Sequence, residues 1–341
     1  MKAFVAMGGG VLEPREVDEP EPAAGQAVVT VTACTLCGSD LHDLHAAQPT
    51  PRVLGHELAG IVAAVGAGVE VEPGTAVAVL PTAACGACPP CEAGRPNLCR
   101  QSYAMTLGYG LPGGLAEQVL VPRAEVGRTL FPLPDGTDPV VGALAEPAAV
   151  ALRAARRAEA GPGVSVLTLG AGPIGLLVSL CCRLLGAEPV VIVEPRARRR
   201  ETAAALGFPT GADARDPAVT GAFSPSPFGR PDVVVDAAGA PAALEAAVRA
   251  VRPGGRLLAV AGYGAAPALD MNYLIRKEVD IVSSFAYTPD DYAEALRLLL
   301  DGALPAGALI THRFPHADAA AAFDVAAGDD AVKVAVTGER R

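Results

Sequence analysis

The sequence predicts an α/β protein in which a β-rich region is followed by a doubly wound parallel sheet. Before residue 145, short β-branched runs alternate with Gly and Pro, which is typical of short strands joined by turns. Between Val164 and Ser284, continuous apolar runs alternate with helical stretches, which indicates parallel strands covered on both faces. Between the two regions, the Ala-, Leu- and Arg-rich stretch Ala145–Arg157 predicts a helix.

The individual elements follow from these patterns. The strands expected in the first region are Val28–Val31, Gly60–Val65, Ala76–Val79 and Gln118–Val121. Those expected in the second are Val164–Leu169, Val190–Val193, Val233–Asp236, Arg256–Ala261 and Val279–Val282, with helices at Ile174–Leu185 and Ala242–Val251. A helix at Asp291–Leu300 and a strand at Val332–Val336 are expected in the tail. The Pro-, Ser- and Gly-rich segment Asp216–Arg230 predicts a surface loop.

Length, charge and composition restrict the class of protein. A chain of 341 residues, 51% of them hydrophobic, suffices for two or three domains. Its net charge of −10 disfavours binding to nucleic acid or to an anionic membrane. No segment predicts a membrane-spanning helix, and the three glycines Gly8–Gly10 interrupt the N-terminal apolar run too early for a signal peptide. We therefore expect a cytoplasmic protein whose eight cysteines are metal ligands or buried thiols.

A glycine-rich turn follows the expected strand Val164–Leu169 and opens the next helix. Its sequence is Gly170-Ala171-Gly172-Pro173-Ile174-Gly175, which is G-x-G-x-x-G in a strand–turn–helix setting. Gly170 permits the tight turn, Gly172 lets a pyrophosphate approach the backbone, and Gly175 allows close packing of helix on strand. The helix N-terminus then faces the phosphates. The motif predicts a dinucleotide site, the alternative being a glycine-rich turn in another α/β protein.

The residues after the next strand indicate which dinucleotide is bound. Glu194 ends that strand, where a carboxylate would hold the ribose hydroxyls of NAD. Four arginines follow, namely Arg196, Arg198, Arg199 and Arg200. Most of them are expected to form a solvated helix face, while one, Arg199, is a candidate for stacking on adenine or binding the 2′-phosphate of NADP. Because Glu194 would repel that phosphate, NAD is favoured over NADP.

Four cysteines lie close together before residue 100. The spacing is Cys85-x₂-Cys88-x₂-Cys91-x₇-Cys99, and intervening glycines and prolines let the segment fold around one ion. Four thiolates leave no open position, so they predict a structural zinc site. A disulfide pair is the alternative in an oxidising compartment. A nucleic-acid-binding zinc ribbon is disfavoured by the scarcity of basic residues.

A second group of candidate ligands is spread along the chain. Cys37 lies in Cys37-Gly38-Ser39-Asp40-Leu41-His42, His56 and Glu57 are adjacent, and Glu146 precedes Pro147. One thiolate, one imidazole and one or two carboxylates suit a zinc ion that keeps a free position for substrate. Each residue alone has a structural alternative, because cysteines and histidines pack in cores and glutamates lie on surfaces.

These motifs resemble, in the same order and over nearly the whole chain, those of the zinc-dependent medium-chain alcohol dehydrogenases. The similar segments are Cys37–His42, the signature Gly55-His56-Glu57-x₂-Gly60-x₅-Gly66, the four-cysteine segment, Glu146-Pro147, Gly170–Gly175, Val251–Gly255 and Thr311–Pro315. Glu57 and Glu146, in place of a second cysteine, are similar to the polyol and threonine dehydrogenase branch.

The resemblance implies a domain organisation and a cofactor set. A GroES-like catalytic domain would comprise residues 1–147, completed by residues 288–341. A Rossmann domain would comprise residues 148–287, and the active site would lie in the cleft between them. Two zinc ions are implied per chain: a structural ion at the four cysteines and a catalytic ion held by Cys37, His56 and either Glu57 or Glu146. A homodimer or homotetramer joined near Val279–Phe285 is also implied.

The same resemblance implies a reaction. The enzyme would transfer a hydride between a small secondary alcohol and NAD, with zinc acidifying the alcohol. Ser39 would accept the alcohol proton and pass it, by way of the cofactor ribose, to His42 and solvent. Two departures bear on the substrate. Ala286 stands where sorbitol-type relatives usually carry an arginine, and the stretch between His42 and His56 is short for the family. Substrate identity therefore cannot be inherited by analogy, and a polyol, cyclitol or amino alcohol is expected.

Three alternatives remain from the sequence. One is an NADPH-linked carbonyl reductase on the same fold. Another is an enzyme that retains tightly bound NAD for an epimerisation or elimination without net NADH. The third is a dinucleotide-binding structural or regulatory protein, which the presence of both Cys37 and Ser39 disfavours.

Overall fold

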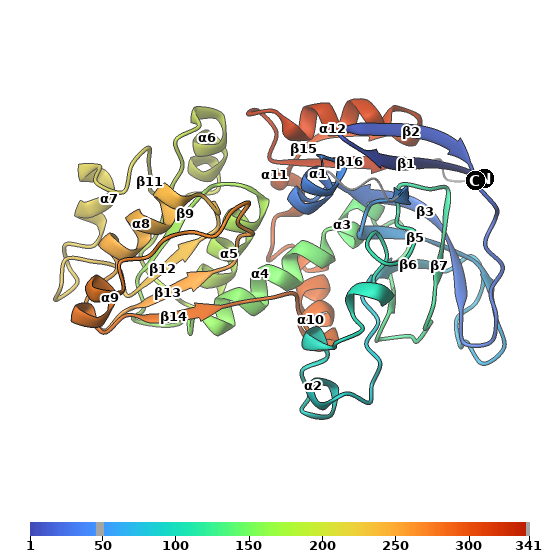
Figure 1. Cartoon of the computed structure of the whole chain (residues 1–341), viewed down its shortest axis with the longest axis horizontal. Helices are drawn as coiled ribbons and strands as arrows, with labels where there is room; N and C mark the ends of the chain where they lie inside the picture. Colours follow the sequence, from blue (N-terminus) through green and yellow to red (C-terminus); the bar gives the residue numbers. More distant parts are fainter. Residues whose placement is uncertain (46–50, 339–341) are drawn as a thin grey trace. The chain divides into compact units, whose positions relative to one another are not determined.

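The computed structural model describes residues 1–45 and 51–338, and the chain divides into two compact units (Figure 1). The first unit comprises Met1–Ala149, Tyr287–Gly302 and Ile310–Arg341, and the second comprises Val150–Ala286 and Ala303–Leu309. The helix α4 (Ala145–Arg157) connects them along the chain. Within the described residues, no helix is both long and apolar enough to cross a membrane.

The first unit is built on a seven-stranded sheet. Its order is β15-β16-β3-β5-β6-β8, and β7 also pairs with β3. The bounds are β3 Ala27–Thr35, β5 Glu57–Val65, β6 Ala76–Val79, β7 Gln118–Val121, β8 Leu130–Pro132, β15 Ile310–Pro315 and β16 Lys333–Thr337. A smaller sheet orders β2 (Val11–Glu16), β1 (Lys2–Gly8) and β4 (Arg52–Val53). Apolar side chains from both sheets share one core, for example Val5 of the smaller sheet with Val29 and Val334 of the larger one.

The register of the larger sheet brings the two ends of the chain together. In β3 and β5, Thr35 is the Cα partner of Glu57, and in β16 and β3, Ala335 is the partner of Thr35. The C-terminal strand β16 therefore lies beside the strand end that precedes Cys37. This pairing joins strands that are distant in sequence, so no local sequence pattern predicts it.

Short helices complete the first unit. They are α1 Gly38–His45, α2 Pro89–Glu92, α3 Pro139–Ala143, α10 Pro289–Leu300 and α12 Ala319–Ala327, with 3₁₀ turns at Pro96–Leu98, Tyr103–Met105 and His316–Asp318. The best-defined start is that of α10, where Thr288 and Asp291 form a reciprocal capping box. This cap explains why the helix begins two residues earlier than the apolar pattern predicts.

The second unit is a parallel six-stranded sheet with the order β11-β10-β9-β12-β13-β14. The bounds are β9 Val166–Leu169, β10 Val190–Val193, β11 Thr210–Gly211, β12 Val233–Asp236, β13 Arg256–Ala259 and β14 Asp280–Ser283. Its helices are α5 Pro173–Leu184, α6 Ala197–Ala205, α7 Pro217–Ala222, α8 Pro241–Ala250, α9 Met271–Lys277 and α11 Ala306–Leu309. Numbered along the unit, the strand order is 3-2-1-4-5-6, that of a Rossmann domain.

The predicted fold class is confirmed, and one local prediction is wrong. The segment Asp216–Arg230 is not a loop throughout, because α7 occupies its first part. Pro217 begins this helix in its first turn, where a missing N–H costs nothing. Val219 and the following Phe223 are both buried in the core of the second unit. Burial of two apolar side chains thus stabilises a turn of helix in a segment rich in helix-breaking residues.

Candidate active site and metal sites

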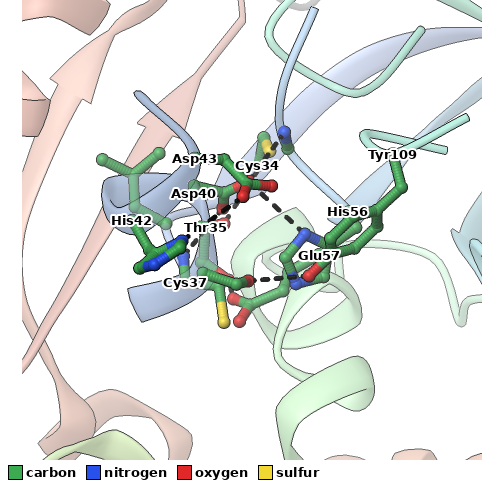
Figure 2. A network of polar contacts seen from close by, with 12 residues as sticks. Cys34, Thr35, Cys37, Asp40, His42, Asp43, His56, Glu57 and Tyr109 are labelled. Atoms are coloured by element: carbon green, nitrogen blue, oxygen red, sulfur yellow. Dashed lines mark hydrogen bonds and ion pairs between the residues drawn. The ribbon is translucent and has the colours of Figure 1, made fainter. Parts of the chain in front are cut away.

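Asp40 joins the two chain segments that carry the candidate metal ligands Cys37 and His56. One of its oxygens, Oδ2, accepts a hydrogen bond from the Cys37 N–H at 2.9 Å, and Oδ1 accepts one from the Gly55 N–H at 3.2 Å. The side chain is 2% exposed and lies at the centre of the network in Figure 2. Cys37 follows strand β3 and His56 precedes strand β5, so this one carboxylate fixes both strand ends against each other. Asp40 lies inside the Cys37–His42 motif, but the sequence did not indicate this role.

Cys37, His56 and Glu57 converge. Their ligand atoms all lie within 4.8 Å of one another, a separation that one ion can bridge. The Nδ1 atom of buried His56 faces Asp40 Oδ1 at 3.4 Å, which leaves Nε2 for a metal. A carboxylate behind a metal-ligating imidazole fixes its orientation and raises its basicity. Thiolate, imidazole and carboxylate form a donor set that fits zinc.

Glu57 is held by two residues that the sequence analysis did not single out. Lys333 Nζ lies 2.6 Å from Glu57 Oε1 and donates to the Leu36 carbonyl at 2.8 Å, while the Thr35 hydroxyl donates to Glu57 Oε2. Both charged side chains are buried, Lys333 at 2% and Glu57 at 0% exposure. Burial alone would lower the pKa of Lys333, but the nearby Glu57 and Cys37 side chains together raise it. The sequence feature that could have indicated this ion pair is the single lysine within the apolar expected strand Val332–Val336.

Glu146 lies in the first turn of α4 and is not one of the three converging ligands. Its carboxyl is 9% exposed. Burial, reinforced by the nearby Glu57 carboxylate, raises the pKa of Glu146 to about 7. A metal cation bound by Cys37, His56 and Glu57 would favour the ionised form of Glu146.

Ser39 and His42 both lie on α1, in different surroundings. Ser39 is half-buried and accepts a hydrogen bond from the Tyr109 hydroxyl at 2.8 Å. The His42 side chain is 73% exposed, with Nδ1 3.6 Å from Asp43 Oδ1. Tyr109 also packs its ring on His56, with centroids 5.0 Å apart (Figure 2). Burial raises the pKa of Tyr109 to about 12, so its hydroxyl keeps its proton near neutral pH. The sequence analysis did not identify Tyr109.

The four cysteines of the second metal site surround one point. The Sγ atoms of Cys85, Cys88, Cys91 and Cys99 lie within 4.8 Å of one another, and all four thiols are free. Four thiolates placed tetrahedrally at a Zn–S distance of about 2.3 Å would be about 3.8 Å apart. Cys88 and Cys91 are 3.5 Å apart, and Cys85 and Cys91 are 4.0 Å apart. The geometry therefore fits a structural zinc ion.

Backbone N–H groups support the thiolates of this site. The Cys85 and Gln101 N–H groups donate to Cys99 Sγ at 3.3 and 3.4 Å. Hydrogen bonds from the Arg100 and Cys91 N–H groups lower the pKa of Cys88 to about 6. Donors of this kind favour the thiolate form that a metal requires.

The glycine-rich turn in the second unit has the geometry expected of a dinucleotide site. Gly170 has φ +102°, and a Cβ added to Gly175 would lie 2.0 Å from the Gly170 carbonyl oxygen, so close packing requires glycine there. Buried Glu194 accepts hydrogen bonds from the Ala171 N–H at 2.8 Å and the Arg196 N–H at 2.9 Å. Its carboxylate thus lies directly against the turn.

The arginines after Glu194 have separate roles. Arg200 donates to the carbonyls of Glu194 and Pro195 at 2.8 and 3.0 Å, so it holds the local backbone. By contrast, the Arg199 guanidinium lies over the glycine-rich turn, where Nη1 would be 3.9 Å from a Cβ on Gly172. The Arg199 side chain therefore lies close to the glycine-rich turn.

Comparison with known proteins matches both units. Residues 23–135 match the family described as an alcohol dehydrogenase GroES-like domain, and residues 173–301 match the family of zinc-binding dehydrogenases. The chain is 34% identical to L-galactonate-5-dehydrogenase of Escherichia coli K12, over 92% of this chain and 91% of that protein. The chain belongs to the zinc-dependent medium-chain alcohol dehydrogenases. This dehydrogenase thus carries the zinc-binding and oxidoreductase chemistry of the family.

Two further similarities cover nearly the whole dehydrogenase. L-idonate 5-dehydrogenase of Vitis vinifera is 34% identical, over 90% of this chain and 86% of its own. A zinc-binding dehydrogenase from Sinorhizobium meliloti 1021, solved bound to NADP, has a TM-score of 0.87 and 33% identity, covering 98% of each chain. The predicted fold class and reaction class are both confirmed by these relationships.

Proposed function

We propose that this dehydrogenase oxidises a secondary hydroxyl of a small polyol or sugar acid, using NAD as the hydride acceptor. The observation that carries the proposal is the convergence of Cys37, His56 and Glu57, with Tyr109 contacting both His56 and the Ser39 hydroxyl. Cys37 and His56 would hold the catalytic zinc, with Glu57 or Glu146 as the carboxylate ligand. Zinc supplies a Lewis acid that polarises the substrate oxygen.

The chain's own residues supply the proton path. Ser39 accepts the proton of the alcohol, because its hydroxyl has acceptor capacity beside the metal-ligand cluster. His42 exchanges the proton with solvent, to which its ring is 73% exposed. Glu194 supports the choice of NAD, since a buried carboxylate against the glycine-rich turn would repel a 2′-phosphate. Arg199 lies close to the glycine-rich turn, where a guanidinium would favour the 2′-phosphate of NADP.

The test is nicotinamide reduction by the zinc-loaded protein across polyols, cyclitols, amino alcohols and sugar acids, with NAD and NADP in parallel. Zinc-dependent turnover with NAD on a secondary alcohol is the expected result. A strong preference for NADP would assign the dominant role at the cofactor site to Arg199 instead of Glu194. If zinc and cofactor bind but no alcohol is oxidised, the proposed reaction is wrong.

Ser39→Ala is expected to reduce kcat by about 10²–10⁴-fold, the usual contribution of a positioned proton-transfer group. Zinc content and NAD affinity should stay at the wild-type level, because Ser39 is not one of the converging ligands. Steady-state kinetics with metal analysis checks both parts. Turnover at the wild-type rate would exclude Ser39 from the proton path.

We also propose that the chain forms a homodimer or homotetramer through the second unit. Strand β14 lies at the edge of its sheet, and its residue Ile281 is 47% exposed. Met271 and Ile275, on the preceding helix α9, are 57% and 67% exposed. An exposed apolar edge strand is normally covered in a native assembly. Sedimentation velocity should give a dimer or tetramer, and Ile281→Lys should shift it toward the monomer. A monomeric wild-type protein at micromolar concentration would contradict this assembly.

A further inference from the structure

Tyr109 contacts two groups of the candidate active site at once. Its hydroxyl donates to Ser39 Oγ at 2.8 Å, and its ring packs on the His56 imidazole with centroids 5.0 Å apart. Figure 2 shows the Tyr109 ring beside His56, on the side away from His42. One side chain therefore links the expected proton acceptor to an expected metal ligand.

The turn that carries Tyr109 is fixed against the backbone next to His56. A Cβ added to Gly108 would lie 2.9 Å from the Gly55 carbonyl, and one added to Gly113 would lie 2.3 Å from the Gly55 oxygen. The Tyr109 N–H donates to the Thr106 carbonyl at 3.2 Å, which closes the turn. Because glycine allows this close approach, Tyr109 is held in place by backbone packing as well as by its own contacts.

We propose that Tyr109 is a positioning residue for the proton transfer that Ser39 performs, an inference that rests on the proposed function. A serine hydroxyl has one donor and two acceptor sites. The Tyr109 hydroxyl occupies one acceptor site, which leaves the second to receive the proton of the alcohol. As Ser39 gains that proton it releases its own toward His42 and solvent, so the serine carries no net charge afterwards. Without Tyr109, the Ser39 hydroxyl is free to rotate among its staggered positions.

Tyr109→Phe tests this directly, because it removes the hydroxyl and keeps the ring on His56. We expect kcat to fall about tenfold, a part of the 10²–10⁴-fold that proton transfer contributes. KM should stay within about twofold, because the ring that lines the site remains. In a Ser39→Ala background, Tyr109→Phe should cause no further loss, since the two residues act as one unit.

Tyr103→Phe is the matched control. Tyr103 is 62% exposed, and its ring lies 5.4 Å from that of Tyr109, but its hydroxyl accepts from Arg52 and does not contact Ser39. Its removal should leave kcat unchanged. Equal losses in the two tyrosine variants would reduce Tyr109 to a structural residue and overturn the inference.

A spectroscopic measurement does not depend on turnover. The chain has no Trp and six Tyr, so the near-ultraviolet absorption band reports tyrosine hydrogen bonding without overlapping tryptophan absorption. Ser39→Ala should shift this band in the wild-type background and leave it unshifted in Tyr109→Phe. Absence of the shift, or full turnover by Tyr109→Phe, contradicts the inference while the proposed function stands. A wild-type protein that binds zinc and NAD but oxidises no alcohol contradicts both.

Discussion

Lys333→Met is expected to lower the free energy of unfolding by about 3–5 kcal/mol, the usual cost of leaving a buried charge without its partner. Glu57 is 0% exposed, and its Oε1 atom lies 2.6 Å from Lys333 Nζ. Methionine has a similar length but no charge, so Glu57 would lose its cationic partner and keep the hydrogen bond from the Thr35 hydroxyl. Urea unfolding of the zinc-free protein, followed by circular dichroism, measures the loss.

A second substitution identifies the cause of this loss. In Lys333→Met with Glu57→Gln, neither member of the pair carries a charge, so most of the lost stability should return. The control Lys2→Met replaces an exposed lysine and should change stability by less than about 0.5 kcal/mol. The loss should also shrink when zinc is added, because the ion would supply positive charge beside Glu57. If Lys333→Met unfolds at the wild-type urea concentration, the ion pair is not a source of stability.

The alternating second unit was the most predictable part of the fold. Buried parallel strands form continuous apolar runs, so Val190–Val193 and Val233–Asp236 were predicted with the bounds that the structure has. The hairpin of β1 and β2 was not predicted, because β2 is largely exposed and shows no apolar alternation. Helix α7 was missed for a similar reason, since two buried side chains outweigh its breaker-rich composition.

The candidate site was predictable as a set of residues but not as a geometry. The sequence offers Cys37 and His56 as candidate ligands, but their convergence depends on the register of β3 with β5 and on the carboxylate of Asp40. Lys333 reaches the site because β16 pairs with β3. In sequence it is 297 residues away from Leu36, whose carbonyl it contacts. No local pattern encodes such a pairing. A lysine inside an apolar strand is still a usable cue, because buried charges are almost always paired.

Cys37→Ala should have the largest effect on activity. It removes the thiolate from the Cys37, His56 and Glu57 cluster, and the variant is expected to bind one zinc per chain in place of two. Loss of a Lewis acid that contributes several kcal/mol to the transition state corresponds to a decrease in kcat of at least about 10³-fold. Metal analysis and turnover, measured on the same preparation, check the two parts together.

Two other cysteines provide matched comparisons. Cys34 lies three residues earlier, is 1% exposed in β3, and is not among the converging ligands, so Cys34→Ala should retain two zinc ions. Cys91→Ser should also bind a single zinc, but the missing ion belongs to the four-cysteine site. That variant is expected to become susceptible to proteolysis between Cys85 and Cys99, because its fold there depends on the metal. If Cys37→Ala binds two zinc ions, or if Cys34→Ala loses one, the assignment of Cys37 as the catalytic thiolate ligand is wrong.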